Sequence, residues 1–380
     1  MKDNRYHILI LDADHKNTLA IVRHLGKTGK YSIDLTGHNK NSISFFSKYV
    51  SGKHLTGNPN TSPGKYLEDI IHLLKRKKYL TVIPVSHISY KILSKYKKEV
   101  SEYTHITIPD YKQVETASNK IETYALARNL KIPYPEIITL QNIDEIENID
   151  TVFPCVIKAP FEAGKNLVEY ANNKNELIAK YKKLCKENDF GSTLPVIQKY
   201  IQGEGAGFFA FYKEGKCVNY FMHQRIREYP VTGGASTAAK SFYDESVMNY
   251  GKRILDSLNW NGVAMVEFKK DNKTGIFNLM EINAKFWGSL DLALEAGINF
   301  PEMLIDNALG NTIKKYSYKN IRFQWILNGD LFHVFERPKD FPFFVKDLFT
   351  AKNDILISDI KPNLFQLSYI PVHYYKKWFK

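Results

Sequence analysis

Cysteine is scarce in this 380-residue chain, which contains only Cys155, Cys185 and Cys217. These residues form no CxxC pair, and an odd, widely spaced set of three argues against both a disulfide framework and a zinc site. We therefore interpret each cysteine as a small, mostly buried apolar side chain without a chemical role.

Long apolar runs are also missing. No stretch of about 18 apolar residues occurs, so the sequence predicts no membrane-spanning helix. The first residues, MKDNRYHILILDADHK, contain one short apolar segment that is followed directly by acidic residues. A secretory signal needs a longer apolar region and a cleavage site made of small residues. We therefore expect a cytoplasmic protein.

Two recognition motifs are absent as well. The first predicted strand-to-helix turn, LDADHKN, lacks the GxGxxG pattern of dinucleotide-binding folds. The net charge is +13, from 53 basic against 40 acidic residues, but most of the excess is lysine. No arginine-rich cluster or nucleic-acid-binding motif accompanies this charge. We therefore expect no nucleic-acid partner.

The first 110 residues contain an alternation of strand and helix patterns. Apolar runs at 7–14, 31–37, 79–86 and 105–110 predict strands, and amphipathic segments at 16–30, 63–78 and 89–100 predict helices. Strands and helices in alternation are typical of a parallel sheet with helices on both faces. The sequence therefore predicts an α/β domain at this end of the chain.

From about residue 112 the pattern becomes a mixture typical of α+β proteins. Helices are predicted at 114–130, 173–188, 244–260 and 289–310. Strands are predicted on either side of a glycine-containing loop within 151–170, and antiparallel strands with turns at 203–207 and 214–215 within 194–229. A hairpin is predicted over 262–283. Beyond about 312 the pattern weakens, and only 321–327 and 354–362 resemble strands.

The predicted hairpin brings two carboxylates together. A turn centred near Lys273 or Thr274 places Glu267 almost opposite Glu281, and directly opposed residues lie about 5 Å apart. Two like charges at this distance are unfavourable unless a cation lies between them. Asn283, two residues after Glu281 and on the same face of the strand, adds a neutral oxygen. Such oxygens suit Mg²⁺. The alternative is a solvent-exposed face on which each acid pairs with a lysine.

Two lysines favour a site for an anion near this cation. Lys158 lies on the apolar segment VFPCVIKA, where a buried ammonium needs an anionic partner. Lys120 begins a helical stretch, and the loop FEAGKNL contains one glycine and one lysine. Taken singly, these features also fit surface lysines and an ordinary loop.

Seven motifs occur in order between about residues 116 and 310: Lys120, IPYP, FPCVIKA, VIQKYIQGEG, HQRIREYPVTGGAST, VEF and MEINAKFWGSL. This series resembles the ATP-grasp superfamily, and most closely its carbamoyl-phosphate-synthase-like carboxylate–amine ligases. The resemblance implies a pre-ATP-grasp α/β domain over 1–115. A two-lobed ATP-grasp domain would follow over 116–311, with a lid at about 151–205, and a C-terminal extension over 312–380.

The resemblance also implies roles for individual residues. Phosphate contacts are implied for Lys120 and Lys158. Adenine and ribose contacts are implied for Gln198, Lys199, Tyr200, Ile201 and Glu204, and magnesium ligation for Glu267, Glu281 and Asn283. Arg225 and Lys285 are implied to act at the transferred phosphoryl group. The family commonly has arginine in the place of Lys285, and a lysine keeps the charge without the bidentate fork. Weaker candidates in the same cleft are Arg227, Gly233, Gly234 and Ser236.

The implied activity is an ATP-dependent ligation that uses Mg²⁺, or Mn²⁺ in its place. A carboxylate would be activated as an acyl phosphate and joined to an amine, with release of ADP and phosphate. The fold leaves open an ATP-grasp kinase, a carboxylate–thiol ligase and an ATP-binding regulatory protein without turnover. The implied partners are small-molecule carboxylate and amine substrates, with a homodimer as the assembly that such ligases often form.

The last residues of the chain mix aromatic and basic side chains. This composition suits weak contact with a membrane surface, and the alternative is a tail that packs on the body of the protein. The residues concerned are Tyr369, Tyr374, Tyr375, Lys376, Lys377, Trp378, Phe379 and Lys380.

Overall fold

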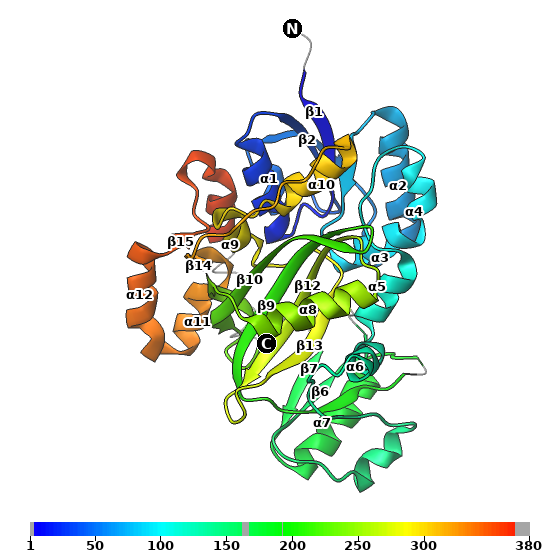
Figure 1. Ribbon diagram of the computed structural model, residues 1–380, viewed down its shortest axis with the longest axis vertical. Coiled ribbons are helices and arrows are strands. Elements are labelled where there is room, and N and C mark those ends of the chain that lie inside the picture. Colours follow the sequence, from blue (N-terminus) through cyan, green and yellow to red (C-terminus); the bar gives the residue numbers. More distant parts are fainter. Residues whose placement is uncertain (1–3, 162–166, 192, 369–380) are drawn as a thin grey trace.

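The computed structural model describes residues 4–161, 167–191 and 193–368. Three sheets form its framework, and helices pack around them (Figure 1). The chain runs from the first sheet at one end of the molecule to the smallest sheet at the other end, and then builds the largest sheet between them. In the described ranges no helix combines the length and the apolar character needed to cross a membrane.

The N-terminal sheet is parallel, as the sequence predicts. Its strand order is β3-β2-β1-β4, with β1 at Tyr6–Ile10, β2 at Tyr31–Gly37, β3 at Val50–Leu55 and β4 at Thr81–Ile83. Helices α1 (Lys16–Gly26), α2 (Pro63–Arg76), α3 (His87–Lys95) and α4 (Lys97–Ser101) connect and extend these strands. The chain adds β2 and β3 on one side of β1 and then returns to add β4 on the other side.

Two details of this sheet differ from the prediction. Strand β3, in the segment VSGKHL, went unpredicted because its residues alternate between half-buried and exposed at the sheet edge. The segment 105–110 was predicted as a strand, but it contributes only an isolated bridge between Thr81 and His105. The segment ends at Asp110, which caps the next helix through a reciprocal pair of hydrogen bonds with Gln113.

The predicted helix over 114–130 is two helices, α5 (Tyr111–Ser118) and α6 (Lys120–Asn129). Asn119 separates them in an extended conformation, and its side chain accepts hydrogen bonds from the backbone N–H groups of Ile121 and Glu122. An asparagine at this position stabilises the start of the second helix. The break therefore fixes Lys120 as the first residue of α6.

A small lobe follows, built on an antiparallel sheet in the order β5-β8-β6-β7. Its strands are β5 (Ile137–Ile138), β6 (Cys155–Lys158), β7 (Val168–Ala171) and β8 (Val196–Lys199). Helix α7 (Lys174–Glu187) packs on it through Leu177 and Tyr181, which share a core with Ile157. This lobe spans most of the segment that we predict to be a lid.

The largest sheet has seven strands in the order β13-β12-β9-β10-β11-β14-β15. Their bounds are β9 Gly203–Lys213, β10 Lys216–Tyr229, β11 Ala235–Ser241, β12 Gly262–Asp271, β13 Phe277–Asn283, β14 Arg322–Gln324 and β15 Lys352–Asn353. The turn predicted at 203–207 is wrong, because these residues lie within β9 and pair with β12. Glycine is required there: a Cβ on Gly203 would lie 1.6 Å from the carbonyl oxygen of Lys270.

Both faces of the large sheet are covered. In β9, Phe208, Ala210 and Tyr212 share a core with α8 (Glu245–Ser257), while Phe209 and Phe211 share another with α9 (Leu290–Glu295) and α10 (Phe300–Leu309). Side chains alternate between faces along a strand, so an unbroken apolar run is what a central strand with two buried faces requires.

The region after residue 312 completes the large sheet through β14 and β15 and adds α11 (Leu331–Glu336) and α12 (Phe341–Thr350). The strand predicted over 354–362 is wrong. Ile357–Asp359 is a 3-10 turn, and residues 361–368 are helical. Buried Asp354 and Asp359 shape this segment by accepting hydrogen bonds from other parts of the chain. The aromatic and basic tail of the sequence prediction lies outside the described residues.

Candidate active site

A cavity of about 600 Å³ lies where the three sheets meet. Its walls come from the loops after β1 and β4, from β6 and β7 of the small lobe, and from β10, β12 and β13 of the large sheet. A pocket of this size, with charged side chains converging on it, is suited to a small-molecule ligand.

The β12–β13 hairpin places the two predicted acids in this cavity. Glu267 pairs with Glu281 in the register of the strands, as predicted, and a bulge follows immediately between Glu267 and Phe268. Asn283 also lines the cavity, and its Nδ2 donates a hydrogen bond of 2.8 Å to Oε1 of Glu281. The three oxygen-bearing side chains therefore form one cluster.

Six lysine and arginine side chains line the cavity. They are Lys16, Lys120, Lys158, Arg225, Lys269 and Lys285. Lys158 extends from β6, and Lys120 begins α6, where its backbone N–H donates to the carbonyl oxygen of Pro160. Against these six cations, the cavity wall carries five carboxylates, on Glu228, Glu267 and Glu281 at the hairpin side and on Asp12 and Asp14 at the N-terminal side. The excess of positive charge favours an anionic ligand.

The pKa values of these groups reflect burial and mutual proximity. Burial lowers the pKa of Lys158 to about 8, and it lowers that of Lys285 to about 8 with help from the charge of Lys120. Burial raises the pKa of Glu267, and the neighbouring charge of Glu281 adds to this effect. For Glu281 burial is outweighed by Lys120, by the Asn283 hydrogen bond and by Lys158, so its pKa is lowered.

Arg225 is the cation nearest to the acid pair. Its Nη2 lies 2.8 Å from Oε2 of Glu267, and its Nη1 donates to the carbonyl oxygen of Gly234 at 3.1 Å and lies 3.4 Å from Glu228. Gly205, on the neighbouring strand, makes room for this side chain: a Cβ there would lie 2.7 Å from Cδ of Arg225. Arg225 therefore lines the cavity while it contacts the carboxylates of Glu228 and Glu267.

The predicted adenine and ribose contacts do not line this cavity. Gln198 points into the core, where its Nε2 donates to the hydroxyl oxygen of Tyr124 at 2.6 Å. The ring of Tyr200 stacks under the ammonium of Lys269, and the Glu204 carboxylate accepts a hydrogen bond from Gln224. Lys199, which is exposed, and Ile201, which is buried, also lie outside the cavity wall. Their roles toward a nucleotide remain predictions.

The motif HQRIREYPVTGGAST divides between the cavity and the core. Arg225, Gly233, Gly234 and Ser236 line the cavity. Arg227 does not, because its guanidinium is buried between Asp330 and Asp347, each 2.7 Å away. Most of the predicted phosphate loop FEAGKNL, residues 162–166, lies outside the described residues.

Sequence reasoning missed the part of the cavity that the N-terminal domain contributes. Asp12, Asp14, His15 and Lys16 follow β1, and Ser86 and His87 follow β4. These two neighbouring strands lie where the chain reverses its direction of sheet growth, which is the crevice where open α/β sheets commonly bind ligands. The acidic end of the first strand was visible in the sequence, but its neighbour in the sheet was not.

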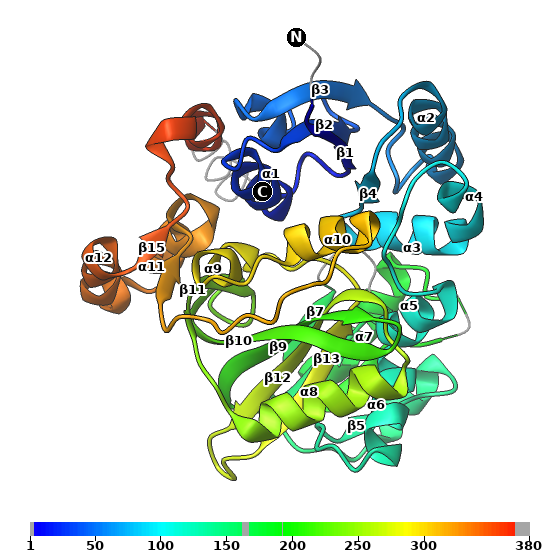
Figure 2. The same cartoon turned by 45° about the horizontal axis from the view of Figure 1, so that its top comes forward.

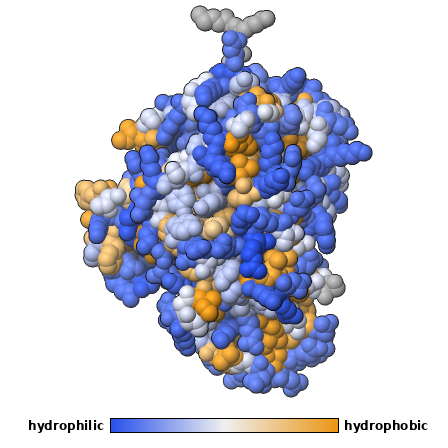
Figure 3. Space-filling view, in the orientation of Figure 1, coloured by the Kyte–Doolittle hydropathy of each residue, from blue (hydrophilic) through white to orange (hydrophobic). Residues whose placement is uncertain are grey.

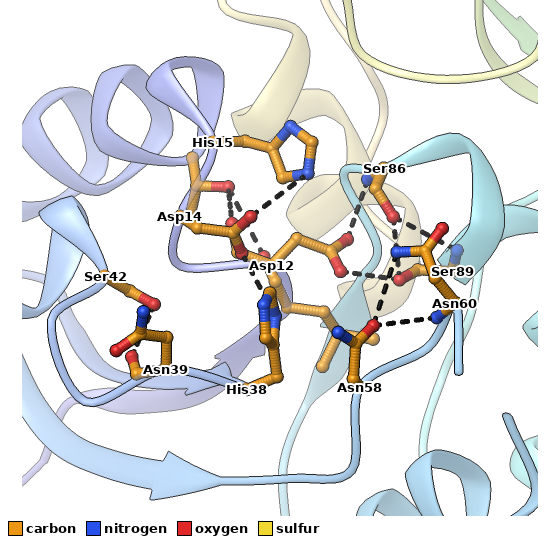
Figure 4. A network of polar contacts seen from close by, with 12 residues as sticks. Asp12, Asp14, His15, His38, Asn39, Ser42, Asn58, Asn60, Ser86 and Ser89 are labelled. Atoms are coloured by element: carbon orange, nitrogen blue, oxygen red, sulfur yellow. Dashed lines mark hydrogen bonds and ion pairs between the residues drawn. The ribbon is translucent and has the colours of Figure 1, made fainter. Parts of the chain in front are cut away.

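Asp12 and Asp14 play different parts in this crevice (Figure 4). Asp12 is buried with φ at +63°, and it accepts hydrogen bonds from the N–H groups of Val85 and Ser86 and from the Ser89 hydroxyl. It therefore ties the loop after β1 to the loop after β4. Asp14 instead is exposed, and its ion-pair partners among the described residues are the imidazoles of His15 at 3.7 Å and His38 at 4.0 Å.

The oxygen donors of the hairpin fit a divalent cation. Two facing carboxylates and an amide oxygen are hard ligands of the kind that Mg²⁺ and Mn²⁺ prefer. Among the described residues no group of three or more His, Cys, Asp or Glu side chains is arranged to hold a metal ion. A metal at this hairpin would therefore depend on Asn283, or on ligand oxygens, to complete its coordination.

Comparison with known proteins supports the resemblance seen in the sequence. Residues 213–328 match a family model described as ATP-grasp in the biosynthetic pathway with Ter operon. A D-aspartate ligase of Enterococcus faecium (strain Aus0004) is 22% identical over 255 residues. This match covers 62% of the present chain and 60% of the ligase, so the chain spans less than two thirds of the relative that it matches.

Solved structures share the fold at low sequence identity. A biotin carboxylase domain from Hydrogenobacter thermophilus, in complex with MgADP and bicarbonate, aligns with a TM-score of 0.66 at 17% identity over 83% of this chain and 73% of that one. An L-amino acid ligase from Bacillus licheniformis aligns with a TM-score of 0.63 at 14% identity over 82% and 77%. At these identities the likeness shows the fold alone.

Proposed function

We propose that the chain, which matches an ATP-grasp family model over residues 213–328, is an ATP-dependent ligase of the ATP-grasp superfamily that joins a carboxylate to an amine in the cytoplasm. The observation that carries this proposal is the pair Glu267 and Glu281, which face each other across the hairpin inside a cavity with an excess of cations. Two opposed carboxylates at such a place suit a metal-bound polyphosphate better than any neutral ligand.

The residues of the cavity divide the proposed work among them. Lys120 and Lys158 would hold phosphate oxygens, and Arg225 and Lys285 would offset the charge that moves with the γ-phosphoryl group. The carboxylate substrate would attack this group to give an acyl phosphate and ADP, and the amine would then displace phosphate to form an amide. Positioning and fixed charge supply the catalysis, and no protein nucleophile is needed.

Glu267, Glu281 and Asn283 would hold Mg²⁺ or Mn²⁺, which would neutralise charge on the β- and γ-phosphates. In the structure Arg225 lies against Glu267 and balances its charge. We propose that Arg225 turns from Glu267 toward the γ-phosphoryl group when the metal takes over this carboxylate. Its side chain is one-fifth exposed, which leaves its guanidinium accessible from the cavity.

The nucleotide base would bind in the apolar part of the cavity. Met265 and Met280 from the hairpin and Tyr170 from β7 line it alongside the cations. The segment from Gln198 to Ile201 and Glu204 would reach the base and the ribose once the small lobe closes. A lobe that closes over the cleft would also keep water from the acyl phosphate.

We place the amine substrate at the N-terminal crevice. The carboxylate of Asp12 accepts hydrogen bonds from backbone N–H groups and from the Ser89 hydroxyl, whereas the carboxylate of Asp14 faces the imidazole of His15. A cationic amine would pair with Asp14. Replacing Asp14 by Asn should then raise KM for the amine without changing KM for ATP. Glu68→Gln on exposed α2 is the matched control, and equal effects of the two would contradict the placement.

A phosphate-release assay tests the proposed reaction. The full-length protein is incubated with ATP and Mg²⁺ and with panels of amino acids, dipeptides and small carboxylic acids. We expect release only when a carboxylate and an amine are both present, together with an amide product found by mass spectrometry. Turnover with an alcohol or a thiol as acceptor would instead identify a kinase or a carboxylate–thiol ligase.

ATP binding without turnover on any panel would overturn the enzymatic proposal in favour of a regulatory ATP-binding protein. Sedimentation of the same preparation tests the homodimer, which the resemblance implies and which we propose as the assembly.

A further inference from the structure

The outer face of the C-terminal region is apolar to an unusual degree. In the described part of the chain, 19 large apolar side chains are exposed, and ten of them lie within residues 335–367. Phe349 is 85% exposed and Ile357 is 86% exposed. The other eight are Phe335, Phe341, Phe343, Leu348, Ile355, Ile360, Leu364 and Leu367. We call these ten residues the C-terminal apolar face.

Three of the five acidic residues between 335 and 368 are buried, namely Asp347, Asp354 and Asp359. Asp347 of α12 is buried and pairs with Arg227 and Arg322. Asp359 is buried against Arg23, and it also accepts a hydrogen bond from Ser47. These ion pairs attach the region to the body of the protein through its polar side. The apolar side is thereby left outward, which inverts the usual arrangement of a surface helix.

The exposed charges around the apolar face are almost all positive. Arg337, Lys339, Lys346, Lys352 and Lys361 are exposed, whereas Glu336 is the one exposed acid between residues 335 and 368. Figure 3 shows apolar side chains gathered along the same edge of the molecule on which Figure 1 places α12. Figure 2, turned by 45°, keeps α12 and the last helical residues together on that side.

We propose that the C-terminal apolar face docks on the surface of an anionic lipid bilayer. Aromatic and aliphatic side chains would enter the interface between headgroups and acyl chains, and the surrounding lysines and arginine would attract the anionic headgroups. Positive charge next to the apolar side chains is what selects a membrane over a neutral protein partner. The chain continues past residue 368 with five aromatic residues and three lysines, a composition of the same kind.

Docking of this kind would hold the protein at the membrane without a spanning segment. The apolar face lies on helices and turns that are tied through Arg227 to β10, the strand that carries Arg225. The proposal does not depend on the ligase activity, because it rests on residues outside the cavity.

Flotation of the full-length protein with lipid vesicles tests the proposal. Vesicles of phosphatidylcholine alone are compared with vesicles containing one quarter phosphatidylglycerol, at low and at high salt. We expect flotation with the anionic vesicles and its loss in 0.5 M salt, because salt screens the attraction of charges near a surface. The double variant F343S/F349S should reduce the ratio of bound to free protein about tenfold.

Two further variants separate the contributions of charge and apolar contact. K339Q/K346Q should weaken binding to anionic vesicles about fivefold for each charge removed and leave neutral vesicles unaffected. L55S and K53Q, at exposed positions of β3, serve as matched controls and should change nothing. Unchanged thermal unfolding of each variant will show that it folds.

Several outcomes would overturn the proposal. The full-length protein failing to float with either vesicle would do so, and so would equal binding to neutral and anionic vesicles. Loss of dimerisation in F343S/F349S without any vesicle binding would assign the face to a second copy of the chain. Binding that survives F343S/F349S but disappears on removal of residues 369–380 would assign it to the tail.

Discussion

Arg225 and Arg227 lie on the same strand, two residues apart, yet their surroundings are opposite. Arg227 is buried between Asp330 and Asp347, with Arg322 on the far side of Asp347 and with Thr237 and Gln324 bonded to Asp330. Two arginines and two aspartates balance, so this cluster is electrically complete. Arg225 belongs to a cavity wall in which cations outnumber carboxylates.

This difference separates structural charges from functional ones. A buried ion pair that is satisfied by its own neighbours attaches one part of a protein to another, as Arg227 attaches the C-terminal region to β10. A group of buried charges that stays unbalanced costs stability and needs a ligand to complete it. Burial alone does not tell a structural charge from a functional one. The number of oppositely charged partners around the buried side chain does.

The largest effect expected from this contrast is on turnover. Replacing Glu281 by Gln removes a proposed metal ligand from the unbalanced cluster and should lower kcat by about 10³-fold, the order of magnitude of losing one preorganised electrostatic contact. Asp271→Asn, in the turn of the same hairpin, is the control and should leave kcat unchanged. A Glu281→Gln enzyme with near-normal kcat in the phosphate-release assay would contradict the assignment.

The free energy of unfolding should depend strongly on Arg227 and only weakly on Arg225. Arg227→Met leaves buried carboxylates short of a partner and should lower the free energy of unfolding by about 3–5 kcal/mol in urea titrations. Arg225→Met should lower that free energy by clearly less, because Lys158 and Lys269 also act on Glu267, while it abolishes turnover. Equal destabilisation by the two substitutions would remove the distinction between the clusters.

The pH dependence of kcat/KM for ATP should reveal the titration of Lys158 and Lys285 in the cavity. Lys158 and Lys285 are cationic below a pKa of about 8 and lose their protons as the pH rises above it. Because phosphate binding needs the charged forms, kcat/KM should fall above about pH 8, by up to about tenfold per pH unit for each proton lost. The arginine of the Lys285→Arg variant stays charged, so the fall in kcat/KM should be less steep in that variant. A flat profile from pH 7 to 10 would contradict a role of both lysines in phosphate binding.

The smallest effect expected is a gain in stability. The pKa of Lys158 is lower in the folded protein than the ordinary value of 10.5, so its charged form is penalised by folding at pH 7, and this penalty disappears as the pH rises toward that value. Lys158→Met should therefore raise the free energy of unfolding at pH 7 by about 1 kcal/mol. Lys174→Met, at the exposed start of α7, is the control, and a loss of stability in Lys158→Met would show that this lysine is structural.

Much of the site could be predicted from the sequence because it lies on a hairpin. The register of β12 and β13 follows from one short turn, so the pairing of Glu267 with Glu281 was predicted and is confirmed. The parallel N-terminal sheet was likewise predicted, because its alternation of strands and helices is a local pattern.

Contacts between distant segments were not predictable. The crevice beside Asp14 exists because β4 returns to the free side of β1, an arrangement that depends on strand order and not on local composition. The partners of Arg227, which are Asp330 and Asp347, lie more than a hundred residues along the chain. For the same reason the apolar face of α12 was not predicted from the sequence.

The most direct test of the central claim is a titration of the protein with Mn²⁺ followed by electron paramagnetic resonance, with and without ADP. We predict that the wild-type protein binds Mn²⁺ tightly only when ADP is present, and that the double variant E267Q/E281Q loses this binding while it still folds. Tight Mn²⁺ binding that is the same in both proteins would contradict the claim that this acid pair holds a metal-bound nucleotide.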